Sequence, residues 1–149
     1  MGCYKLALDF RRKYPMTIGF RLKKHCDIID KHLNPDEKIT YLFYGQKNTG
    51  VFDFVNTYVV ALTNQRLIMA TKRLLFGYFF KSITPDLYND LMVNSGVIWG
   101  RILIDTVKEE VTLTNLDKTS LSEIETNITE TMGKLKKQYN IHRGKKEEK

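Results

Sequence analysis

The chain has 149 residues, of which 42% are hydrophobic and 28% are charged, and its net charge is +7. This balance is typical of a globular domain and excludes a disordered or fibrous chain, and no apolar run approaches the roughly 18–20 residues of a membrane span. We therefore expect a single domain. Its two cysteines show no repeated spacing, which favours a reducing, cytoplasmic location over a disulfide-linked scaffold.

The positive charge is concentrated at the two ends of the chain. Residues 1–39 carry a net charge of +4, residues 40–133 carry −2 and residues 134–149 carry +5. We expect residues 1–17 to form a loosely held basic arm and residues 140–149 to form a disordered basic tail. Such arms contact phosphate or anionic lipid, or only keep the protein in solution. Their candidate contact residues are Arg11, Arg12, Lys13, Lys145 and Lys146.

The first regular element is an amphipathic helix over residues 18–33. Leu22, Cys26, Ile29 and Leu33 recur at spacings of four, three and four, which places them on one helix face. The helix is expected to end before Pro35, because the residue preceding proline is driven out of the α region.

Residues 39–116 are dominated by β-branched and aromatic runs separated by Gly, Asn, Asp and Pro, which predicts successive strands. Their connections are mostly two to five residues long, so neighbouring strands should be antiparallel. The seven predicted strands cover residues 39–47, 57–63, 66–72, 75–83, 88–94, 100–106 and 109–115.

The sequence returns to a helical period after the last strand. Ser120 and Glu123 have the spacing of a capping box, and apolar residues then recur on one face up to Tyr139. We therefore predict a helix over residues 120–139 that covers the sheet.

Seven short strands followed by one amphipathic helix resemble a pleckstrin-homology-like (PH-like) barrel. The segments "LNPDEKITYLFYG", "FGYFFKSITPDLYNDL" and "GRILID", together with the turn Leu62-Thr63-Asn64-Gln65-Arg66-Leu67-Ile68, resemble the bacterial PH-like family, and within it the YokE-like branch. The resemblance covers about residues 20–138 and implies an α+β, mainly β fold. In that fold a seven-stranded antiparallel barrel lies between an N-terminal amphipathic helix and a C-terminal capping helix.

The sequence lacks the patterns of a catalytic or metal site. Glu109 and Glu110 are adjacent in a strand, so their side chains point to opposite faces and cannot act as a pair. His25 and His32 are expected on the surface and Cys26 in the core, without the spacing of a metal motif. We therefore expect no enzyme activity, no metal and no cofactor.

The first hairpin and the loop after the third strand are the candidate binding sites. Many eukaryotic PH domains bind phosphoinositides through several cations of the first hairpin, whereas this chain has only Lys47 there. Phe52 and Phe54 either fold back onto the core or dock on a membrane or partner. The candidate binding residues are Lys47, Phe52, Phe54, Lys72 and Arg73.

The segment 75–83 carries bulky apolar residues on both faces of its predicted strand. Either the helix over 18–33 covers the outer face or a second copy of the chain does so. The candidate self-association residues are Phe76, Tyr78, Phe79 and Phe80.

The leading hypothesis is a non-enzymatic module that binds protein, including a second copy of itself, while the basic arms adjust contact with an acidic partner. One alternative is peripheral attachment to an anionic membrane through the arms and the 50–55 loop. Nucleic-acid binding by the arms is a further alternative but is disfavoured, because a nucleic-acid-binding domain would carry its cations on the folded core. The sequence implies no small-molecule substrate.

Overall fold

The structure, a computed structural model, describes residues 2–47 and 56–147. Two helices precede a seven-stranded sheet, and a short 3₁₀ turn (Lys118–Ser120) leads into a long final helix. The elements are α1 (Cys3–Lys13), α2 (Leu22–His32), β1 (Ile39–Gln46), β2 (Thr57–Thr63), β3 (Leu67–Lys72), β4 (Tyr78–Ile83), β5 (Tyr88–Ser95), β6 (Trp99–Thr106), β7 (Glu110–Asp117) and α3 (Leu121–Glu147).

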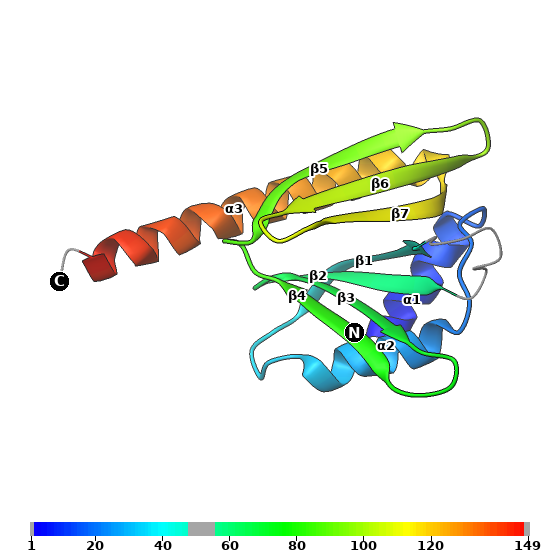
Figure 1. The fold of residues 1–149 in the computed structure, drawn as a ribbon, viewed down its shortest axis with the longest axis horizontal. Helices are drawn as coiled ribbons and strands as arrows, with labels where there is room; N and C mark the ends of the chain where they lie inside the picture. The colour runs from blue at the N-terminus through cyan, green and yellow to red at the C-terminus, as the bar shows by residue number, and fades with distance from the viewer. Residues whose placement is uncertain (1, 48–55, 148–149) are drawn as a thin grey trace.

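The seven strands form one antiparallel sheet in the order β4-β3-β2-β1-β7-β6-β5. The sheet curls into a half-barrel, with β1–β4 and β5–β7 as its two walls (Figure 1). Helices α1 and α2 pack against β1–β3, whereas α3 packs along β5 and β6. The expected α+β, PH-like architecture is confirmed.

Burial along the strands follows from this arrangement. Nearly every residue of β2 and β3 is buried, because the helices cover one face of this wall and the interior of the half-barrel covers the other. In β6, buried residues alternate with exposed or half-buried ones, as expected for a strand with one face in the core. The apolar runs Val59–Leu62 and Leu67–Ala70 therefore mark the centre of the core.

Residues 1–17 do not form the expected loose arm. Cys3, Ala7 and Phe10, at spacings of four and three, lie on the buried face of α1 and pack into the core with Tyr14. This apolar stripe is short and lies next to several basic residues, so the charge pattern by itself predicted a loose arm.

The start of one helix and the start of one strand also differ from the expected positions. Arg21 has a φ of 57°, in the left-handed region, so α2 begins at Leu22 and not at residue 18. Gly77 has a φ of 74°, so residues 73–77 form a turn and β4 begins at Tyr78 and not at residue 75.

The C-terminal tail is also more ordered than expected. Helix α3 continues to Glu147, although its residues from Lys137 onward are exposed. Figure 1 shows this part of α3 extending beyond the sheet. The expected disorder over residues 140–149 is therefore wrong for residues 140–147.

His25 is fully buried, contrary to the expected surface position. Its Nε2 atom lies 3.0 Å from the Phe20 carbonyl oxygen, and its Nδ1 atom accepts a 2.7 Å hydrogen bond from the backbone N–H of Lys72. His25 therefore joins the start of α2 to the end of β3. Cys26 is buried as expected and lies beside Cys3 of α1, both as free thiols.

Candidate functional site

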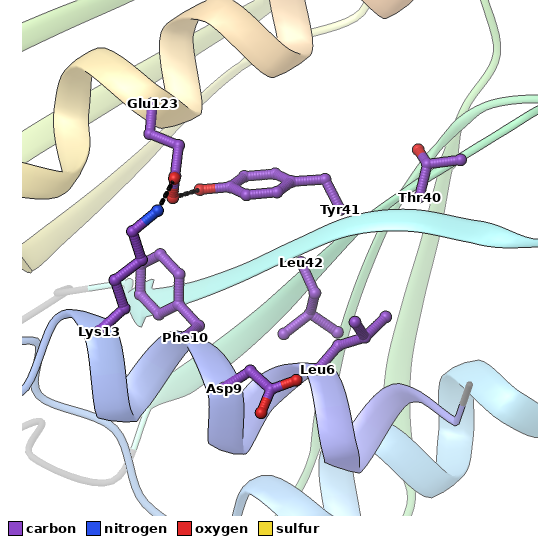
Figure 2. Close-up of a pocket in the computed structure, with 8 residues that line it drawn as sticks. All are labelled: Leu6, Asp9, Phe10, Lys13, Thr40, Tyr41, Leu42 and Glu123. Carbon is purple, nitrogen blue, oxygen red and sulfur yellow. Dashed lines mark hydrogen bonds and ion pairs between the residues drawn. The ribbon is translucent and has the colours of Figure 1, made fainter.

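A small pocket of about 190 Å³ lies between α1, β1 and the start of α3 (Figure 2). Leu6, Phe10 and Leu42 contribute apolar side chains to it. At its mouth the Glu123 carboxylate accepts a 2.9 Å hydrogen bond from the Tyr41 hydroxyl and pairs with the Lys13 ammonium group.

The polar groups of this pocket serve the fold. Burial acts to raise the pKa of Glu123, but the bonds from Lys13 and Tyr41 outweigh it and hold the pKa below its usual value. Burial and the Glu123 carboxylate raise the pKa of Tyr41, so the phenol stays protonated and continues to donate. These contacts join three elements, and we interpret the pocket as a structural junction.

A different surface is formed where the connection between α1 and α2, residues 14–21, crosses one end of the sheet. The backbone of Ile18 bonds to Asn115 of β7 (2.9 Å), and that of Phe20 bonds to Thr57 of β2 (2.9 Å). The Met16 carbonyl accepts a 2.9 Å bond from the indole of Trp99.

The side chain of Arg21 reaches the carbonyl of Lys72 at 3.3 Å. The connection is thus tied to the ends of β2, β3, β6 and β7. We call this end of the sheet, comprising residues 14–21, the β3–β4 turn (73–77) and the β5–β6 turn (96–98), the loop end.

Large apolar side chains are exposed along the loop end. In the β3–β4 turn, Leu74, Leu75 and Phe76 are 65%, 82% and 86% exposed, and in the β5–β6 turn Val97 is 90% exposed. Both turns lie at the same end of the molecule (Figure 1), and the exposed Met16 and Phe20 lie on the connection that runs between them. Clusters of exposed apolar side chains are a common feature of surfaces that contact membranes or other proteins.

Cations accompany these apolar groups. The Lys118 Nζ atom lies 3.3 Å from the Val97 carbonyl, and Arg101 shares a shallow cleft with Gly96 and Trp99. The carboxylate of Asp117, also at this end, is buried and accepts bonds from the backbone N–H groups of Thr119 and Met16. Burial acts to raise the pKa of Asp117, but these hydrogen bonds have the larger effect and lower it.

The structure brings three of the predicted binding residues to the loop end. Lys72 closes β3, Arg73 opens the exposed turn, and Lys47 follows β1 with its Nζ atom 5.7 Å from the ring centre of Tyr58 and 6.0 Å from that of Phe79. Phe52 and Phe54 lie outside the described residues.

The four predicted self-association residues have different surroundings. Phe76 is on the exposed turn, whereas the ring of Phe80 stacks on His32 of α2 with a centroid distance of 4.3 Å. Tyr78 also contacts His32, and Phe79 on the opposite face packs against Tyr58. Helix α2 therefore covers part of the outer face of β4, which was one of the two expected arrangements.

The basic residues of the two predicted arms lie far apart in the fold. Lys13 pairs with Glu123 and Arg11 donates to the Gly19 carbonyl, so these two cations join α1 to other segments beside the loop end. Arg12 pairs with Asp9 at 3.6 Å within α1 itself. Lys145 and Lys146 lie on the projecting end of α3, at the opposite end of the molecule (Figure 1).

Sequence reasoning missed the β5–β6 turn and the α1–α2 connection as parts of the site. The segment Val97-Ile98-Trp99 follows Gly96, and an apolar turn after glycine was the available signal. No residue pattern shows that residues 14–21 cross the sheet, because the hydrogen bonds that tie them to the strands are to residues 37–101 positions away.

The sequence model of a family described as "Bacterial PH domain" matches residues 33–130. A DUF1696 family protein with a pleckstrin-homology domain from Shewanella loihica PV-4 is 13% identical, with a TM-score of 0.48 over 74% of this chain and 88% of that one. A pleckstrin homology domain from Shewanella amazonensis SB2B is also 13% identical, with a TM-score of 0.44 over 78% of this chain and 88% of that one. No curated protein matches the chain significantly.

Proposed function

The chain belongs to the bacterial PH domain family, and from this premise we propose that it is a non-catalytic binding module that docks by its loop end on an anionic membrane surface. The observation that carries the proposal is the exposed Leu74-Leu75-Phe76 tip directly after Lys72 and Arg73. Apolar side chains of such a tip enter the boundary between headgroups and acyl chains, while neighbouring cations attract anionic lipid.

The binding energy in this proposal comes from both kinds of group. Each cation near an anionic surface contributes about 1 kcal/mol, and a fully buried Leu or Phe side chain contributes roughly 1.5–3 kcal/mol. None of the helices within residues 2–47 and 56–147 is long and apolar enough to cross a bilayer. The proposed attachment is therefore peripheral, and the two free thiols support a location at the cytoplasmic face.

Co-sedimentation with vesicles tests this proposal. We expect the protein to pellet with vesicles of phosphatidylglycerol and phosphatidylcholine at low salt, and to remain in solution with phosphatidylcholine alone. Leu75→Asp/Phe76→Asp should abolish pelleting. Val107→Asp is the matched control, since Val107 is also exposed but lies in the β6–β7 turn. Equal pelleting by both variants would reject the loop end as the contact.

Self-association is the second candidate function, supported by the exposure of Phe76 and Tyr78. In this case the β3–β4 turn packs against another copy of the chain and not against lipid. Light scattering over a wide concentration range separates the two, because a mass that stays monomeric rejects self-association. Nucleic-acid binding by the basic residues of α1 and α3 predicts a mobility shift that charge reversal at Lys145 and Lys146 removes.

We also propose the finer placement in the YokE-like branch, on the basis of the Leu62–Ile68 motif. In the fold this motif is the β2–β3 turn, and Asn64 accepts a bond from the backbone N–H of Lys38 in the "NPDEK" segment. A phylogenetic tree of bacterial PH domains that places the chain outside this branch would reject the placement.

A further inference from the structure

A groove of about 440 Å³ lies between helix α2 and the hairpin of β3 and β4. Its walls include Lys24 and Lys31 of α2, Lys72 of β3 and Tyr78 of β4, and Ile28 forms an apolar floor. The two α2 lysines lie outside residues 33–130, the part of the chain that matches the bacterial PH domain family. The groove is therefore a feature that the N-terminal helices add to that domain.

The groove is held in shape by hydrogen bonds. The backbone of Lys72 donates to His25 and accepts from Arg21, both of them at the start of α2. On the other wall, the Tyr78 hydroxyl lies 3.3 Å from His32 Nε2, while His32 Nδ1 lies 2.7 Å from the Ile28 carbonyl and therefore donates to it. Both walls are thus positioned before any ligand arrives.

The groove is positively charged. Lys24, Lys31 and Lys72 line it, and the one carboxylate among the described residues that line it, Asp27, pairs with Lys23 at 3.2 Å on the neighbouring surface of α2. Three lysines that line one groove with an apolar floor favour a ligand that carries several negative charges.

The edge position of strand β4 indicates that this ligand is an extended chain. Within residues 2–47 and 56–147, β4 is the last strand of the sheet and pairs with β3 alone. The hydrogen bond from the Arg73 N–H to the Gly77 carbonyl shows which residues of β4 bond to β3, because hydrogen-bonded and non-hydrogen-bonded pairs alternate along an antiparallel pair of strands. By this alternation the backbone groups of Phe79 and Lys81 bond to β3. The backbone groups of Tyr78, Phe80 and Ser82 then point to the free edge, which can accept another extended chain.

We propose that this groove binds an extended acidic peptide of a protein partner, which adds a strand to the free edge of β4. The backbone of the peptide bonds to Tyr78, Phe80 and Ser82, and its acidic side chains, every second residue on the side of α2, face Lys24 and Lys31. The site adjoins the loop end, and Lys72 lies beside both, so, given the docking proposed above, the protein links an acidic partner to the surface on which it docks.

The charges favour this occupant over another copy of the chain. A second β4 paired edge to edge would place its own lysine-lined groove against the first, and each chain carries a net charge of +7. Like charges held at short range oppose such a dimer, whereas a peptide that carries carboxylates on one face is attracted.

Fluorescence anisotropy tests the proposal with a labelled peptide that alternates glutamate with threonine. We expect the full chain to bind it, and the peptide that alternates glutamine with threonine to bind at least tenfold more weakly. Lys24→Glu/Lys31→Glu should lose at least tenfold in affinity. Lys134→Glu/Lys137→Glu, which changes the charge equally on exposed α3, should bind as the wild type does. Equal losses in the two variants would overturn the proposal.

Backbone pairing is tested separately from charge. Hydrogen exchange should slow at the amides of Phe80 and Ser82 when the glutamate peptide is bound. A peptide methylated at alternate backbone nitrogens on its pairing edge should bind at least tenfold more weakly. If the methylated peptide binds equally and these amides exchange unchanged, strand addition at β4 is wrong. Far-UV circular dichroism establishes that each variant is folded.

Discussion

Arg66 holds the carboxylate of Glu37 through two hydrogen bonds, Nε to Oε2 and Nη2 to Oε1, each 2.9 Å long. The Glu37 side chain is fully buried, and the Thr63 hydroxyl donates a further bond to Oε2 at 2.6 Å. Burial acts to raise the pKa of Glu37, but the bonds from Arg66 and Thr63 hold it below its usual value. The β2–β3 turn is therefore fastened to the segment that precedes β1.

Replacing Arg66 by Met should destabilise the fold by about 3–5 kcal/mol, because it leaves the buried Glu37 carboxylate without its partner. Adding Glu37→Gln to that variant should restore part of the loss, since the unpaired charge is then removed. Urea unfolding measures the free energies. Lys23→Met, which breaks the exposed pair with Asp27, is the control and should change stability by less than about 1 kcal/mol. A small loss for Arg66→Met would mean that the ion pair is dispensable.

The same contact shows how far the sequence could predict this fold. The residue pattern located all seven strands. Two short motifs from the four segments that carry the family resemblance, "NPDEK" and "LTNQRLI", were visible as a helix stop and a turn. The ion pair between Glu37 and Arg66 that joins the two motifs could not be predicted, because the two residues are 29 positions apart. The residues of each motif are already accounted for by its local structure, so neither motif indicates a distant partner. The loop end was only partly predictable for the same reason. Lys72, Arg73 and Phe76 were chosen as candidate residues, but the connection that places Met16 and Phe20 beside them depends on bonds to distant strands.

The stability of the protein should fall as the pH is lowered from 6.5 to 4. Burial, assisted by the charge of Arg21 and opposed by the bond to Phe20, lowers the pKa of His25 to about 4. Below pH 6.5 the unfolded chain takes up a proton that the folded chain accepts only near pH 4, so protonation favours unfolding across this window. The shift corresponds to about 3 kcal/mol, with the full contribution present above pH 6.5.

Urea unfolding at several pH values measures this dependence of stability on pH, and His25→Asn serves as the control. Asparagine can still accept the bond from Lys72 but does not titrate, so the variant should be less stable at pH 7 and should depend less on pH between 6.5 and 4. If the variant and the wild type show the same slope in this window, His25 is not the group responsible.

Two glycine substitutions should have opposite effects on stability. A Cβ atom at Gly19 would lie 2.4 Å from the Cδ2 and Cε2 atoms of the buried Tyr44 ring, so Gly19→Ala should cost about 1–3 kcal/mol. Gly133, inside α3, has nothing within 4 Å of such an atom, and Gly133→Ala should stabilise the protein by about 0.5–1 kcal/mol. Thermal unfolding compares the two variants with the wild type. A Gly19→Ala protein as stable as the wild type would show that the connection over residues 14–21 is not packed tightly on β1.

Two charge reversals distinguish the loop end from the end of α3 as the membrane contact. Lys72→Glu/Arg73→Glu and Lys145→Glu/Lys146→Glu change the net charge by the same amount, but the first pair adjoins the exposed Leu74-Leu75-Phe76 tip and the second lies at the opposite end of the molecule (Figure 1). Loss of two cations at the contact removes about 2 kcal/mol of attraction, and the new carboxylates add repulsion. The first variant should therefore bind anionic vesicles at least tenfold more weakly at low salt, while the second should bind almost as the wild type does. Equal weakening of both variants would show that binding follows net charge alone, and would remove the loop end as the specific contact.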